Sequence, residues 1–127
     1  MNGVLTFELE SKSYTLRFGM IATEIFSKKA VREMQLMDDR GDVDQVASDF
    51  KAFVACVYAG LCNQADFIDE QYPKWGDVFE LTELIVENQQ LQLDIWEAFK
   101  NSRPAKALFE RLSPEQVEKK KKLTGKK

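Results

Sequence analysis

Two groups of apolar residues near the N-terminus each alternate with polar ones. They are Leu5, Phe7 and Leu9, and then Tyr14, Leu16 and Phe18. Residues two apart in a strand share a face, so the pattern predicts a β-hairpin over residues 3–19 with one apolar side. We expect a polar loop at residues 10–13 and three cross-strand pairs: Leu9 with Tyr14, Phe7 with Leu16 and Leu5 with Phe18.

After Gly19 the apolar residues recur at helical spacing. The spacing predicts helices over about 20–37, 43–62, 77–101 and 105–112. Asn63, Pro73 and Gly76 favour a break over residues 63–76, and Asp77-Val78-Phe79-Glu80 resembles a capping box that opens the third helix. Asn88 and Gln92 interrupt the apolar stripe of that helix, so it contains a kink near residues 87–90 or consists of two separate helices.

A lone two-stranded hairpin is marginally stable in water, so its apolar face must be covered by helices, by another chain, or by both. We therefore expect an α+β, mostly helical fold, in which the hairpin packs on a bundle of about four to five helices. The predicted hairpin and helices together form one domain over residues 1–112. Ser113-Pro114 is a helix-start signal, and the Lys-rich segment that it opens predicts an exposed basic helix or tail over residues 113–127.

The composition narrows the class of protein. The chain has 127 residues, 44% of them apolar, which suits one globular domain with a modest core. No apolar run approaches the about 18 residues of a membrane helix, and the first residues lack the pattern of a signal peptide. We therefore expect a cytoplasmic protein that does not span a membrane.

The chemistry-bearing residues give no catalytic or metal-binding pattern. The chain has no histidine, which excludes Ser-His and Cys-His catalysis and His-bound zinc. Cys56 and Cys62 point away from each other on a helix and are interpreted as core residues. The acidic run over residues 38–44 lacks the ligand spacing of an EF-hand, and Asp66, Asp69 and Glu70 are interpreted as a surface loop. We expect no enzymatic activity, no cofactor and no bound metal.

The charge is unevenly distributed. Residues 1–112 carry 19 acidic and 12 basic residues, whereas residues 113–127 carry 2 acidic and 6 basic ones. A basic tail on an acidic body is typical of a segment that meets an anionic partner, and equally of a solvated helix end. Lys119, Lys120, Lys121 and Lys122 are the candidate nucleic-acid contacts, but no aromatic residues are interleaved, which argues against sequence-specific recognition.

The order of the first elements resembles that of tail assembly chaperones of long-tailed, siphovirus-like bacteriophages. The resemblance lies in Leu5-Thr-Phe-Glu-Leu9 and Tyr14-Thr-Leu-Arg-Phe-Gly-Met20, followed by a hydrophobic helix with Phe53-Val-Ala-Cys-Val-Tyr-Ala-Gly-Leu61. An acidic helix such as 77–87 is also common in that family. The resemblance covers about residues 4–100, and the proline-broken 63–76 segment and Asn88-Gln-Gln depart from it.

The resemblance implies a non-enzymatic chaperone in the cytoplasm of a bacterial host. Such proteins bind the tape-measure protein, which has long apolar helices, and keep it soluble while the tail tube protein assembles around it. The resemblance thus implies these two proteins as partners, and open hairpin edges together with wide apolar stripes favour a homo-oligomer. The candidate partner-binding residues are Phe7, Phe18, Phe26, Phe53, Tyr58, Trp75 and Trp96. The alternatives are a small accessory protein that binds nucleic acid non-specifically through its tail, and a homo-oligomeric interaction domain.

Overall fold

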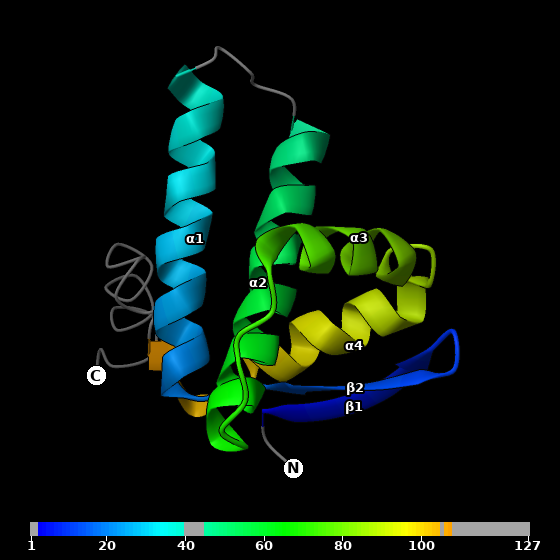
Figure 1. Ribbon diagram of the computed structural model, residues 1–127. Helices are drawn as coiled ribbons and strands as arrows, with labels where there is room; N and C mark the ends of the chain where they lie inside the picture. Colours follow the sequence, from blue (N-terminus) through cyan, green and yellow to red (C-terminus); the bar gives the residue numbers. More distant parts are fainter. Residues whose placement is uncertain (1–2, 40–44, 105, 108–127) are drawn as a thin grey trace, which may run out of the picture.

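The computed structural model describes residues 3–39, 45–104 and 106–107. A two-stranded antiparallel hairpin is followed by four helices, which confirms the predicted α+β, mostly helical fold (Figure 1). The elements are β1 (Val4–Leu9), β2 (Lys12–Arg17), α1 (Met20–Asp39), α2 (Gln45–Phe67), α3 (Trp75–Ile85) and α4 (Gln89–Lys100). No helix in the described part of the chain is long and apolar enough to cross a membrane.

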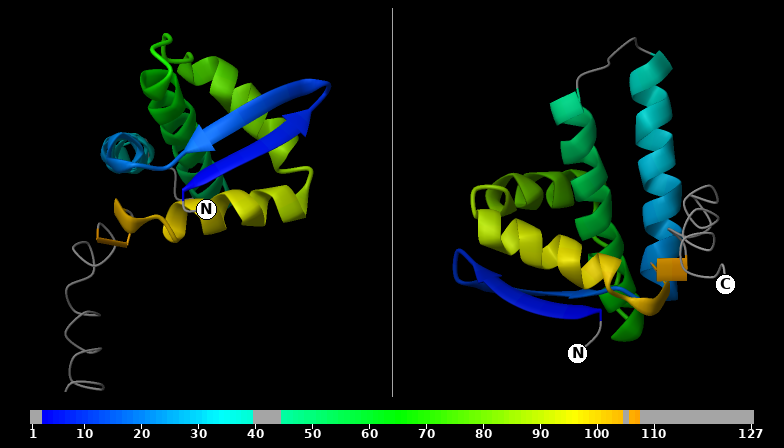
Figure 2. Two further views of the ribbon diagram at one scale, coloured as in Figure 1. Left: turned by 90° about the horizontal axis from the view of Figure 1, so that it is seen from below. Right: turned by 180° about the vertical axis from the view of Figure 1, so that it is seen from behind.

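Helix α2 is the centre of the fold. It runs antiparallel to α1 on one side, and α3, α4 and the hairpin pack against its other side (Figures 1 and 2). Its apolar stripe explains this position, because seven apolar side chains of α2 between Phe53 and Cys62 are buried. The core is completed by large side chains of the other elements, namely Leu16, Phe18, Phe26, Val78, Ile85, Ile95 and Phe99.

The register of the hairpin differs from the predicted one by two residues. Leu9 pairs with Lys12, Phe7 with Tyr14 and Leu5 with Leu16, so the loop is Glu10-Ser11 and not residues 10–13. Both loop residues have positive φ, 49° and 68°, as a two-residue type I′ turn requires. This turn matches the right-handed twist of the strands, and the shift by an even number keeps the apolar residues on one face.

Two helix boundaries between residues 62 and 77 also differ from the predicted ones. Helix α2 continues past Cys62 to Phe67, and α3 begins at Trp75, after Lys74, with no side-chain cap. The expected capping box at Asp77 is therefore wrong, because Asp77 already lies in the first turn. The interrupted third helix is two helices, and Asn88 caps the second by accepting a hydrogen bond from the Leu91 N–H at 3.1 Å.

The end of α2 shows why the break comes later than expected. The Glu70 N–H donates to the Ala65 carbonyl at 2.7 Å, and Asp69 has a φ of +62°, which together form a Schellman ending. Residues 103–104 and 106–107 are helical, and the rest of the predicted 105–112 helix and the 113–127 tail lie outside the described residues.

A side chain from α2 caps the first turn of α1. The backbone N–H groups of Gly19 and Ala22 donate to Oδ1 of Asn63 at 2.9 and 3.0 Å. Gly19 occupies the N-cap position but has no side chain of its own, so the buried Asn63 supplies the acceptor that a local Ser or Asp usually provides. This contact ties the turn between β2 and α1 to α2.

The hairpin reaches α2 closely because position 60 is glycine. A Cβ atom at Gly60 would come within 2.9 Å of Cε1 of Phe18 and 3.0 Å of Cβ of Leu16. These two side chains are 3% and 0% exposed, so they have no free space to move into. Gly60 thus sets how deeply β2 lies against the helices.

The strained turn gives a stability prediction. Replacing Glu10-Ser11 by Asn-Gly should raise the free energy of unfolding by about 1 kcal/mol, because Asn and Gly accept positive φ more readily. Urea unfolding followed by circular dichroism measures it. Ser13→Gly, at an extended position of β2, is the control and should destabilise. A loss of stability in the Asn-Gly variant would contradict the turn described above.

The contact between Asn63 and the first turn of α1 gives a second stability prediction. Asn63→Ala should lower the free energy of unfolding by about 1–3 kcal/mol, because two buried N–H groups lose their acceptor. Asn63→Asp keeps an oxygen at that position and should lose less. Equal losses in the two variants on urea denaturation would show that the side chain stabilises by packing and not as a cap.

Candidate partner-binding surface

Three of the sequence-predicted partner-binding residues lie in the core. Phe18, Phe26 and Phe53 are at most 9% exposed. They form an aromatic cluster with two side chains of α4: Phe18 and Phe26 lie 5.3 and 4.8 Å from Phe99 between ring centroids, and Phe53 lies 5.5 Å from the half-buried Trp96. The cluster joins α1, α2 and α4 to the residue that follows β2, and these three rings are inaccessible to a partner in this conformation.

Tyr58 and Trp75 are half-buried and pack on each other. Their rings meet edge to face at 5.3 Å between centroids, and Nζ of Lys29 lies 4.6 Å from the centroid of Trp75 and 5.5 Å from that of Tyr58. A cation over aromatic faces is attracted by their negative centres, so Lys29 on α1 fastens the start of α3 to α2. These contacts hold the first residue of α3, a helix whose N-terminus has no side-chain cap.

Phe7 lies on the helix-facing side of the hairpin. It stacks on Tyr14, with ring centroids 5.6 Å apart, and both rings are half-buried. The sequence-predicted residues therefore do not form one contiguous site. They mark the core, the start of α3 and the hairpin.

A groove does run along the side of β2. Two hollows of about 450 and 340 Å³ share three lining residues, Tyr14, Leu61 and Pro73, and together we name them the β2–α3 groove. Leu81 and Leu84 of α3 line its larger part, and Ser13 and Thr15 of β2 line its smaller part. A concave apolar surface of this size is typical of a binding site.

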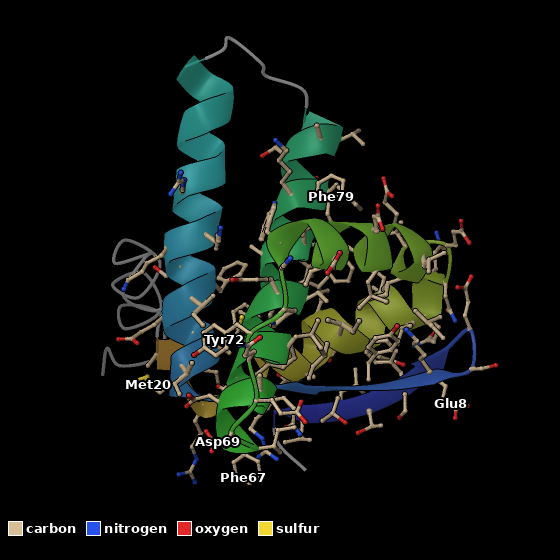
Figure 3. All side chains as sticks on the ribbon, viewed as in Figure 1. Glu8, Met20, Phe67, Asp69, Tyr72 and Phe79 are labelled. Carbon is tan, nitrogen blue, oxygen red and sulfur yellow. The ribbon has the colours of Figure 1, made fainter. Side chains whose placement is uncertain are left out.

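Three exposed apolar side chains lie between the end of α2 and the start of α3. Phe67, Ile68 and Tyr72 are 65%, 47% and 46% exposed, and we name them the apolar rim. Figure 3 shows Phe67 and Asp69 at the lower end of α2, with Tyr72 on the segment that leads back up to α3. Ile68 also lines the groove, so the rim extends its apolar surface. Exposed large apolar residues beside a groove are typical of an interaction surface.

Arg17 orders this end of the surface. Its guanidinium carbon lies 3.6 Å from the centroid of the Phe67 ring, and its Nε donates to Oε1 of Gln64 at 3.0 Å. One face of the exposed ring is thus covered by a cation that β2 supplies. The sequence analysis missed the rim because it placed residues 63–76 in a loop. Two adjacent large apolar residues in an expected loop, Phe67 and Ile68, could have indicated an exposed apolar surface.

The charged residues that line the groove are mainly acidic. Glu70, Asp77 and Glu80 line its two hollows, and Lys12 is the basic residue among its lining side chains. The surface therefore favours an apolar partner segment that carries positive charge.

The two thiols belong to the interior. Burial raises the pKa of the Cys62 thiol to about 11 and raises that of Cys56 well above its usual value. Burial, followed by the neighbouring Cys62 sulfur, raises the pKa of the Tyr58 hydroxyl to about 12. Groups held in their neutral forms in this way are poor nucleophiles at neutral pH.

Among the residues that the structure describes, no three His, Cys, Asp or Glu side chains are grouped so that they could hold a metal ion. Lys119, Lys120, Lys121 and Lys122 lie outside the described residues, so their role in binding nucleic acid stays a prediction.

Comparison of the chain with models of protein families, with curated proteins and with solved structures gives no match.

The buried thiol gives a pH prediction. The pKa of the Cys62 thiol rises from 9.0 to about 11 on folding. The stability that the folded protein gains from the neutral thiol is therefore fully present below pH 9 and is lost as the pH rises towards 11. Urea unfolding under reducing conditions should show stability falling over this range, and less steeply in Cys62→Ala. Identical slopes for the two proteins would contradict a thiol held neutral by burial.

Proposed function

We propose that this protein is a non-enzymatic assembly chaperone that binds an apolar segment of another protein. The observation that carries the proposal is the β2–α3 groove with its apolar rim, which joins an apolar floor to three exposed large side chains. Burial of apolar surface contributes about 25 cal/mol per Å², so a partner that covers this surface can be held without a charged anchor.

The client that we propose is the tape-measure protein of a long-tailed bacteriophage. This identification rests on the resemblance of residues 4–100 to tail assembly chaperones. The surface is compatible with it, because a client with long apolar helices needs apolar cover until the tail tube protein surrounds it. On this proposal the protein acts in the cytoplasm of the host, and self-association competes with client binding wherever the two use the same surface.

The test is co-expression with the tape-measure protein encoded in the same genome. The wild-type chain should keep the client soluble and elute with it on size exclusion. The double variant Phe67→Ser, Ile68→Ser should yield much less complex, since both side chains are exposed and their loss spares the core. Leu93→Ser is the matched control, because Leu93 is 58% exposed but lies on α4 and does not line the groove.

Two outcomes would contradict the proposal. An insoluble tape-measure protein in the presence of the wild-type chain would remove the chaperone function. An equal loss of complex in the control and the double variant would remove the apolar rim as the binding surface.

A further inference from the structure

The outer edge of β2 presents backbone groups that pair with nothing in the hairpin. A two-residue loop is closed by a hydrogen-bonded pair, here Leu9 with Lys12, and pairs of this class then recur at every second position. The bond from the Phe18 N–H to the Gly3 carbonyl, at 2.6 Å, continues the same series. The residues between these pairs therefore turn their N–H and C=O groups outward, and on β2 they are Ser13, Thr15 and Arg17.

These outward groups are free within the described part of the chain. No described backbone group outside the hairpin bonds to Ser13, Thr15 or Arg17. Ser13 and Thr15 also line the smaller hollow of the β2–α3 groove, so the free edge and the apolar floor of Leu61 and Pro73 belong to one surface. The edge of β1 differs, because β1 runs beside α4 (Figure 2).

The charges indicate which kind of chain could occupy this edge. Glu70, Asp77 and Glu80 border the groove and favour a segment with basic side chains.

We propose that β2 accepts an extended partner segment of alternating apolar and basic residues as a third strand of the sheet. Its backbone bonds to the outward groups of Ser13, Thr15 and Arg17, and its apolar side chains lie on the groove floor. The acidic residues that border the groove attract the positive charge of its basic side chains. The inference deepens the proposed function and, for the natural client, rests on it: a client segment is held extended at this edge.

A short blocked peptide of alternating valine and lysine is the probe. We expect it to bind the full chain, with slower amide hydrogen exchange at Ser13, Thr15 and Arg17 by NMR. A peptide of the same sequence, N-methylated on the nitrogens of one edge, cannot donate to β2 and should bind at least about tenfold more weakly. A valine–glutamate peptide should also bind more weakly, because the groove border is acidic.

A substitution in the protein, Thr15→Pro, tests the same edge of β2. The Thr15 N–H points outward, so proline removes a donor that the hairpin does not use, and edge strands tolerate proline at such positions. The Thr15 hydroxyl also lies 3.0 Å from that of Thr6, so Thr15→Val is the matched control: it loses the hydroxyl and keeps the N–H. Thr15→Pro should bind the valine–lysine peptide at least about tenfold more weakly, and Thr15→Val like the wild type.

Three results would overturn the proposal. They are equal binding by Thr15→Pro and wild type, equal binding of the methylated and unmethylated peptides, and sedimentation showing a wild-type dimer that Thr15→Pro abolishes and the peptide does not displace. If Thr15→Pro does not fold, Ser13→Pro and the methylated peptide carry the same test. Co-expression separates the two proposals: a client kept soluble by both Thr15 variants would refute the added strand and leave the chaperone function standing.

Discussion

The junction between the hairpin and the helices depends on the contact between Asn63 and the first turn of α1. The chain reverses from a strand into a helix at Gly19, where the helix needs an acceptor for its free N–H groups. Asn63 supplies it from one turn before the end of α2, across 44 residues of sequence. A hydrogen bond between buried groups is directional, so it fixes where α1 begins and how the hairpin leaves it. Apolar contacts alone would not set that direction.

The groove follows from the same geometry. Gly60 lets β2 lie directly on α2, and the Schellman ending at Asp69 turns the chain so that it passes β2 before α3 begins. The hairpin and α3 thus lie on the same side of α2 with the β2–α3 groove between them, and the described residues supply no third strand that fills it. The Lys29 ammonium group lies over the Trp75 ring and so holds the start of α3. The hollow is therefore bounded by elements that are each fastened separately to α2.

Local patterns predicted the elements well and their details less well. Alternation identified the hairpin face, but the Glu10-Ser11 turn lacks the Gly or Asn that identifies a two-residue loop, so the predicted register was two residues off. Asn63 was interpreted as a turn residue, because no local pattern shows that a side chain serves another helix. Hydrophobicity marked Phe18, Phe26 and Phe53 without showing whether a helix of this chain or a partner covers them. The apolar rim was missed because its exposure depends on where α2 ends.

The order of contacts along the chain has a consequence for synthesis on the ribosome. The hairpin needs only the first residues, so it can form as soon as these leave the exit tunnel. Its cover comes much later: Gly60 and Asn63 lie near the end of α2, and Phe99, whose ring lies 5.3 Å from that of Phe18, lies near the end of α4. The apolar face of the hairpin is therefore not fully covered until α4 has emerged. The charged residues Lys12 and Arg17 on β2 limit pairing between neighbouring nascent chains during that interval.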